Sequence, residues 1–216
     1  AGITTEKFYS ICEALKILNN VRHETVGIPL TQPQLEALGV KVLLDRLIAR
    51  RLFAFAIKVA EFKKLPPAEG RSRILAHWAM YKVVEAPSKK DEKEIAAEIN
   101  SRLNQDPEIS YSDIAEKAIE CGKRQLAIQL LEHEVRADRQ VPLLLKLEQG
   151  AQALRKAIFS GDTDLVYHVI LNLKEKHSTA DFHMIMRQDN IGSKLYSLYC
   201  QQPGQQALLS DWLQQE

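Results

Sequence analysis

The sequence predicts an all-α fold, an α-solenoid of stacked antiparallel helix pairs with a repeat of about 40 residues. The first observation is that "AIECGKRQLAIQLL" at 118–131 returns as "AIFSGDTDLVYHVIL" at 157–171, with Gly122 and Gly161 39 residues apart (161 − 122). A looser copy, "YCQQPGQQALLSDWL", places Gly204 another 43 residues on (204 − 161). The second observation is that the apolar stretches are rich in Leu, Ile and Ala and seldom alternate with period two. One hairpin cannot bury both its faces, so such copies are expected to stack. The alternative is an irregular bundle in which the two hairpins match by chance.

Composition narrows the class of protein. The 216 residues are 26% charged, yet the charges cancel to +1, which argues against binding nucleic acid by neutralising its phosphates. The three cysteines are far apart and form no CxxC pair, which predicts reduced thiols in the cytosol. No apolar run approaches the ~18 residues of a membrane span. The start of the chain is polar and lacks Met, so we expect an excised fragment.

Helical spacing and end signals predict thirteen helices with short polar loops between most of them. In order, the ranges are 5–20, 32–50, 52–63, 71–84, 91–103, 111–121, 124–134, 141–147, 150–159, 163–176, 180–187, 191–201 and 204–214. No long linker separates two blocks of helices. We therefore expect 1–216 to form a single α-solenoid fragment.

Several helix ends are marked by specific residues. Thr31 with Gln34 has the form of a capping box with Pro33 in the first turn, and "SYSD" at 110–113 repeats the device with an acid. Gly122 and Gly161 stand where a helix ends in the left-handed conformation. In "GDTD" at 161–164 the acids favour the start of the next helix, and this explains the motif better than a calcium loop.

The repeated hairpins also predict which residues form the core. Apolar residues at i, i+3, i+4 and i+7 define one buried stripe on each helix. The predicted inner faces comprise Tyr111, Ile114, Ala115, Ala118, Ile119, Leu126, Ala127, Leu130, Leu131, Leu154, Ala157, Ile158, Leu165, Val166, Val169, Ile170 and Leu173. Leu130 and Ile170 are predicted to be equivalent core positions on the second helix of each pair.

The sequence indicates no catalytic constellation. It contains no GxGxxG, GxxxxGK[ST], GxSxG or HExxH motif, and its six histidines are scattered. His77, beside Trp78, is the most interesting of them, but a lone histidine on a helix is usually structural. In "EHE" at 132–134, Glu and His occupy adjacent positions that face different directions, so the motif is a weak metal signal. We expect no catalytic residue, no cofactor and no metal.

Candidate interaction residues fall into basic and apolar groups. Arg46 and Arg50 are four apart on one helix face and could meet acidic partners or lipid head groups, although ordinary ion pairs would also explain them. Lys123 and Arg124 form a second basic cluster. The final predicted helix has more apolar side chains than one inward stripe can use, which predicts an exposed patch suited to weak self-association. Its residues are Leu208, Leu209, Trp212 and Leu213. The alternative is that all of them fold inward, so that this helix caps the array.

Long stretches resemble the vacuolar protein sorting-associated protein 16 family. They include "VGIPLTQPQLEALGVKVLLDRLIARRLFAFAIKVAEF", "RILAHWAMYKV", "YSDIAEKAIECGKRQLAIQLLEHE", "QVPLLLKL" and "KAIFSGDTDLVYHVILNLK". The likeness runs from about Phe8 to Trp212 and includes Trp, Pro, Gly and charged positions that a generic helical array would not share.

The resemblance implies the early part of a C-terminal α-solenoid, with an N-terminal β-propeller and the downstream solenoid outside this chain. It implies a cytoplasmic scaffold, peripheral on late endosome and lysosome (or vacuole) membranes, in the HOPS and CORVET tethering complexes. Implied partners are the other subunits, including vacuolar protein sorting-associated protein 33, whose main contact is expected beyond residue 216. Membrane association would be indirect.

Two other classes of function stay open at this point. A helical-repeat RNA-binding module would read bases on a basic concave face, although repeats of 39 and 43 residues are irregular for such a reader. An enzyme would need a site assembled from distant residues around His77 and Trp78. A buried, hydrogen-bonded His77 with no adjoining cleft would speak against the enzyme.

Overall fold

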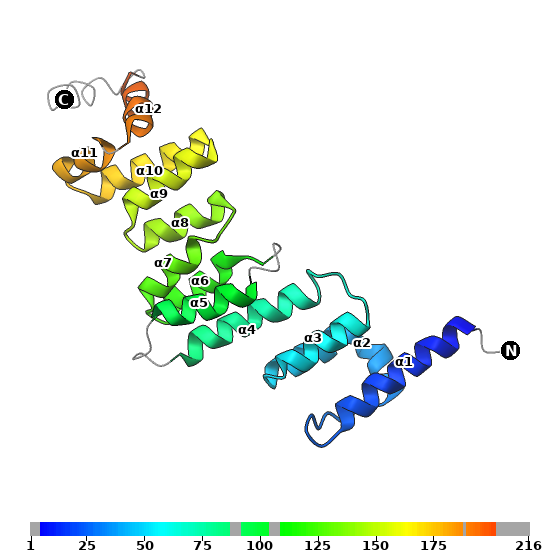
Figure 1. Cartoon of the computed structure of the whole chain (residues 1–216). Coiled ribbons are helices and arrows are strands. Elements are labelled where there is room, and N and C mark those ends of the chain that lie inside the picture. The colour runs from blue at the N-terminus through cyan, green and yellow to red at the C-terminus, as the bar shows by residue number, and fades with distance from the viewer. Residues whose placement is uncertain (1–4, 87–91, 104–108, 188, 202–216) are drawn as a thin grey trace. The chain divides into compact units, whose positions relative to one another are not determined.

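The structure is a computed structural model that describes residues 5–86, 92–103, 109–187 and 189–201 (Figure 1). These residues form twelve helices and no strand, which confirms the predicted all-α, solenoid-like class. The chain divides into two compact units, Ala1–Ser110 and Tyr111–Glu216. A single continuous stack over 1–216 stays a prediction.

The first unit contains five of the helices. They are α1 (Thr5–Arg22), α2 (Gln32–Ala49), α3 (Phe53–Phe62), α4 (Arg71–Glu85) and α5 (Glu92–Leu103). Each packs against the next in the sequence, and α1 and α3 both lie against α2. Buried leucines of α1 and α2, including Leu18, Leu43, Leu44 and Leu47, fill the space between them. Core packing of this kind, more than helix propensity, holds such helices in place.

The start of α2 follows the sequence closely, but its middle does not. The Thr31 backbone N–H donates to Gln34 Oε1 at 2.9 Å, and Pro33 lies in the first turn, as the capping-box pattern predicts. Gly39 then interrupts the helix with φ 78° and ψ 162°. Only glycine adopts such a backbone without strain, so α2 is kinked where the sequence predicts a continuous helix.

The second unit contains the repeated hairpins. Its helices are α6 (Tyr111–Glu120), α7 (Arg124–Leu131), α8 (Ala137–Lys146), α9 (Gly150–Ser160), α10 (Thr163–Lys176), α11 (Thr179–Arg187) and α12 (Asn190–Cys200). The most extensive packing joins α6 to α7, α8 to α9 and α9 to α10. Helices that pack mainly on their neighbours in sequence are typical of a solenoid.

The two predicted turns have the predicted geometry. Gly122 and Gly161 have φ values of 75° and 74°, in the left-handed region that ends a helix. The Asp162 carboxylate accepts from the backbone N–H groups of Asp164 and Leu165, at 3.0 and 3.3 Å, and caps α10. The "GDTD" motif is therefore a helix cap.

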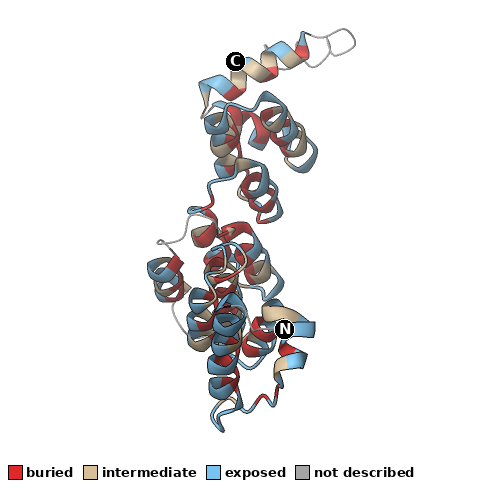
Figure 2. Cartoon of the chain, turned by 90° about the vertical axis from the view of Figure 1, so that its right-hand side faces the viewer, coloured by how far each residue is buried: buried red, intermediate tan, exposed pale blue. Residues whose placement is uncertain are grey.

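The predicted inner faces of the hairpins are also confirmed. Leu130 and Ile170 are 0% and 1% exposed, and most of the other predicted core residues of these helices are buried. Ile119, Ile158 and Leu165 are half-buried. In Figure 2 the buried residues lie on the sides of the helices that face their neighbours.

Two boundaries differ from the sequence-based expectation. The helix predicted to reach 134 ends at Leu131, and the helix predicted to begin at 141 begins at Ala137, so that Pro142 lies inside α8. Proline is favoured in the first turn of a helix, where a start at 141 would place Pro142. Tertiary contact overrides this preference because the buried Gln140 amide donates to the Leu131 carbonyl and holds the start of α8 against the end of α7.

The last predicted helix, 204–214, lies outside the described residues. Among the helices that the structure describes, none combines the length and the apolar character of a membrane-spanning segment.

Candidate interaction surfaces

Two arginines of the basic cluster at 46–51, Arg50 and Arg51, make contacts within their own unit. The Arg50 guanidinium donates to the Val26 carbonyl and so ties the loop after α1 to the end of α2. The Arg51 guanidinium lies 4.5 Å from the Tyr81 ring centre and donates to its hydroxyl at 2.8 Å. The Tyr81 hydroxyl in turn donates to Glu85 at 2.6 Å, and this hydrogen bond raises the Tyr81 pKa. Arg46 is exposed.

The other predicted surface residues lie in the second unit. Arg124 is exposed and faces Glu148 at 4.0 Å, a weak surface pair, and Lys123 is the half-buried residue before α7. Leu208, Leu209, Trp212 and Leu213 lie outside the described residues. The interaction role of all of these residues stays a prediction.

The residues considered for catalysis or metal binding do not come together in one site among the described residues. His77 is exposed on α4, whereas its neighbour Trp78 is buried with the Arg102 guanidinium 4.7 Å from its ring centre. In the described part of the chain, no three His, Cys, Asp or Glu side chains come together as metal ligands.

Glu134 of the "EHE" motif has a structural role that sequence reasoning missed. Its side chain is buried, and its carboxylate accepts from the backbone N–H of Ser112 at 2.7 Å and of Arg136 at 3.1 Å. Ser112 is in the first turn of α6, where backbone N–H groups have no partner within the helix. Glu134 therefore caps α6 from 22 residues away. Burial, and secondarily the negative charge of Glu134, raises the Tyr111 pKa.

A hollow in the second unit lies where α8, α9 and α10 meet. It has a volume of about 460 Å³, and its lining consists of Leu145, Glu148, Gly150, Asn172, Leu173, Lys176 and His177. Glu148 is the carboxylate that faces Arg124. The lining mixes both signs of charge, so it does not define one class of ligand.

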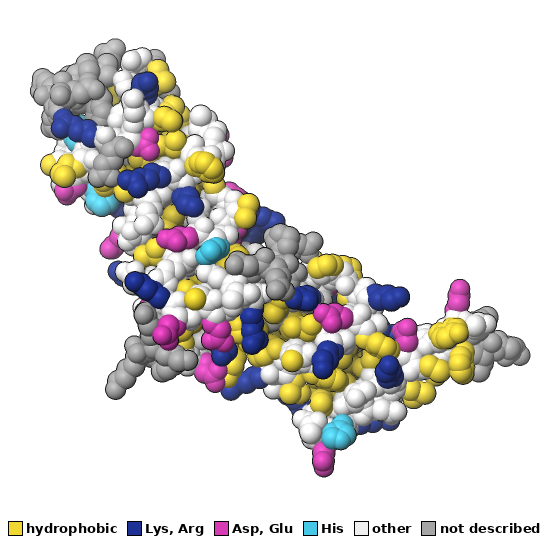
Figure 3. All heavy atoms as spheres, in the orientation of Figure 1, with side chains coloured by type: hydrophobic (Ala, Val, Ile, Leu, Met, Phe, Trp, Pro, Cys, Tyr) yellow, Lys and Arg dark blue, Asp and Glu magenta, His cyan; other side chains and the backbone are white. Residues whose placement is uncertain are grey.

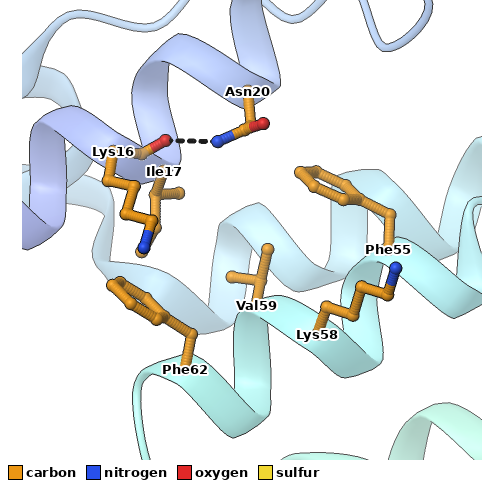
Figure 4. Close-up of a pocket in the computed structure, with 7 residues that line it drawn as sticks. All are labelled: Lys16, Ile17, Asn20, Phe55, Lys58, Val59 and Phe62. Atoms are coloured by element: carbon orange, nitrogen blue, oxygen red, sulfur yellow. Dashed lines mark hydrogen bonds between the residues drawn. The ribbon is translucent and has the colours of Figure 1, made fainter.

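A groove in the first unit is the more distinctive feature, and the sequence patterns do not predict it. It lies between α1 and α3 and has a volume of about 210 Å³. Ile17 and Val59 are buried against the core at its base, and Phe55 and Phe62 stand along the α3 side (Figure 4). In the sequence, Phe55, Val59 and Phe62 have the spacing i, i+4, i+7, which places them on one face of a helix and could have indicated the groove.

Lysines border this groove on both sides. Lys16 of α1 lies with its ammonium group 4.9 Å from the Phe62 ring centre, and Lys58 of α3 extends alongside Phe55 (Figure 4). Figure 3 shows hydrophobic side chains gathered over α1, α2 and α3, with basic side chains among them. The groove is thus apolar inside and cationic at its edges.

Comparison with known proteins places the chain in a family. The model of the family described as "Vps16, C-terminal region" matches residues 109–216, half of the chain. The chain belongs to the Vps16 family. The match begins next to the boundary between the two compact units, at Ser110.

Named relatives extend the similarity to most of the chain. The vacuolar protein sorting-associated protein 16 homologue of Drosophila melanogaster is 38% identical over 193 residues, which are 88% of this chain and 22% of the relative. The homologue of Dictyostelium discoideum is 36% identical over 206 residues, 95% of this chain and 24% of the relative. Protein VACUOLELESS1 of Arabidopsis thaliana is 34% identical over 194 residues, 90% of this chain and 22% of the relative.

These relatives identify the chain as part of a vacuolar protein sorting subunit. The chain spans less than a quarter of their length. They give no support to the RNA-binding alternative.

Proposed function

We propose that this chain is a non-catalytic scaffold segment of a HOPS and CORVET subunit, which supports tethering and fusion of endosomal and lysosomal (or vacuolar) membranes through protein–protein contacts. The observation that carries the proposal is membership of the Vps16 family, with 34–38% identity to the three relatives over most of the chain. The tethering role itself comes from the family resemblance.

The architecture suits a scaffold for a physical reason. Helices that pack on their neighbours bury a continuous core and leave their outer faces for partners. Exposed residues such as Phe8, Phe62 and Phe159 place large apolar side chains on those faces. We propose that the partners are other subunits of the complexes. We place the main contact with vacuolar protein sorting-associated protein 33 beyond residue 216. We also propose that the chain meets late endosomal and lysosomal (or vacuolar) membranes from the cytoplasm and only through partners.

A binding experiment with purified subunits tests this proposal. The chain is immobilised alone and, in parallel, as a longer version that includes downstream solenoid sequence, and each is offered the other HOPS and CORVET subunits singly. We expect the chain alone to retain at least one subunit, and only the longer version to retain vacuolar protein sorting-associated protein 33. Retention of no subunit by either version would contradict the scaffold role.

The same purified chain can be used to distinguish the scaffold role from the RNA-binding alternative. Labelled single-stranded RNA is added at low ionic strength, where phosphate contacts are strongest. We expect no complex in a gel-shift assay. A salt-dependent shift of the RNA band at micromolar concentrations of the chain would favour the RNA-binding module.

A further inference from the structure

The size of the groove between α1 and α3 indicates what kind of ligand it accepts. Its volume of about 210 Å³ is below the roughly 300–1,000 Å³ of pockets that enclose drug-sized molecules. It therefore suits individual anchor side chains of a larger partner. Phe62 at its edge is 37% exposed, so part of its ring is available to a partner at the rim.

The direction of the groove indicates the form of the partner. Phe55 and Phe62 are seven positions apart on α3, which is about 10 Å along a helix. That length accommodates two anchors from successive turns of another helix. Amphipathic helices bind such grooves with apolar residues spaced i, i+3, i+4 and i+7.

The charges around the groove indicate which sign of charge the partner should have. Within the described residues, neither Lys16 nor Lys58 has a carboxylate oxygen at ion-pair distance, 4.0 Å or less. The neighbouring acids are already balanced, since Glu13 pairs with Lys63 at 3.0 Å and Glu61 with Arg71 at 3.5 Å. The two lysines are therefore the uncompensated charges at the rim, and they favour carboxylates on the partner.

We propose that this groove docks an acidic amphipathic helix of a protein partner, with apolar side chains on Ile17, Phe55, Val59 and Phe62 and Asp or Glu side chains facing Lys16 and Lys58. The inference deepens the proposed function and rests on it, because a scaffold acts through such contacts. An anionic membrane is the less favoured occupant. The apolar residues line a hollow, and two lysines contribute only about 1 kcal/mol each at a lipid surface.

A display library of helical peptides tests the site directly. The peptides carry apolar residues at helical i, i+4 and i+7 positions and Glu, Gln or Lys at the flanking positions. After selection on the whole chain, we expect binders enriched in Glu at the flanks. Phe62→Ala and the double variant Lys16→Glu/Lys58→Glu should each weaken the selected peptides at least about tenfold, and selection on the double variant should enrich Lys instead.

Matched controls come from the second unit. Phe159 is 92% exposed and Lys194 is exposed, so Phe159→Ala and Lys194→Glu remove equivalent groups away from the groove. We expect both controls to leave peptide affinity within about twofold, since they do not touch the site. Circular dichroism of every variant checks that helicity is unchanged, because the groove residues to be replaced are exposed.

Three results would overturn the docking site. They are the absence of any enriched peptide, enrichment that ignores flanking charge, and binding of the wild-type chain to phosphatidylserine vesicles that the groove variants abolish. The last result would assign the groove to a membrane. Each is distinguishable from failure of the proposed function, because the chain could lose the groove interaction and still retain a subunit in the binding experiment above.

Discussion

The α6–α7 and α9–α10 hairpins have almost the same sequence signature and different structures. Each pair turns at a left-handed glycine, Gly122 or Gly161, followed four residues later by a leucine. The second helix is 8 residues long in the first pair and 14 in the other. In α10, Asp162 caps the start, whereas Lys123 before α7 provides no side-chain cap.

The difference arises after the turn. Beyond α7 the chain must bring Glu134 back to the first turn of α6 and Gln140 back to the Leu131 carbonyl. Both contacts require α7 to end early, whereas α10 continues to Lys176. A local signature thus sets the turn, while distant contacts set the length of the helix that follows.

The largest expected effects concern the equivalent core positions. Leu130→Ala and Ile170→Ala should each lower the free energy of unfolding by about 2–5 kcal/mol, because each leaves a cavity among buried neighbours. Urea unfolding followed by circular dichroism measures this. Lys174→Ala, on the same helix as Ile170, should change it by less than about 0.5 kcal/mol. A silent Leu130→Ala would show that the first hairpin is packed differently.

Removal of the distant cap should affect only the first hairpin. Glu134→Ala removes the carboxylate that accepts from the buried backbone N–H of Ser112, and such a loss costs about 1–3 kcal/mol. Glu132→Ala, at an exposed position two residues earlier, is the control and should be nearly neutral. Hydrogen exchange of the backbone amides in the first turn of α6 measures the loss locally. If its protection is unchanged in Glu134→Ala, the cap contributes nothing.

The two glycines offer a test in which the hairpins should behave alike. At both positions an added Cβ would meet no atom within 4 Å, so Ala introduces backbone strain without a steric clash. Gly122→Ala and Gly161→Ala should each cost about 1–2 kcal/mol, the penalty of an L-residue in the left-handed region. Thermal unfolding of both variants measures the two costs. Clearly unequal costs would mean that the turns are not equivalent.

Substitutions at the starts of α10 and α7 should differ in their effect on stability. Asp162→Ala should cost about 1 kcal/mol through loss of two hydrogen bonds at the start of α10. Lys123→Ala should cost less than about 0.5 kcal/mol because no side-chain cap is lost there. Denaturant titrations of the two variants make the comparison. Equal losses would contradict the assignment of Asp162 as the cap.

A small pH effect is expected beside the second hairpin. Burial, and secondarily Arg187, lowers the pKa of His183 on α11, which packs against α10. The folded state therefore takes up this proton less readily than the unfolded state, whose histidine pKa is about 6.5. Stability should fall as pH drops through that value, and His183→Gln should reduce the loss. Unfolding titrations at pH 7.5 and 5.5 measure it, and identical pH dependence in wild type and His183→Gln would contradict the effect.

The candidate sites were harder to predict than the helices. The patterns mark Arg50 as a possible interaction residue, which stays a prediction, and they do not reveal that its guanidinium donates to a loop carbonyl of its own unit. They assign no role to the groove residues Phe55, Val59 and Phe62. A groove depends on which neighbouring helix approaches and how closely, and spacing along one helix does not contain that information.

The sequence by itself determined the all-α class, the turns at Gly122 and Gly161, the cap at Asp162 and the inner faces of the hairpins. These follow from local chemistry: backbone conformations open to glycine, a carboxylate beside unpaired N–H groups, and apolar residues at helical period. Only the tertiary structure decided the end of α7, the start of α8 before Pro142, the role of Glu134 and the groove beside Lys16 and Lys58. Each of these depends on residues far apart in the chain, whose meeting is fixed by how whole helices pack.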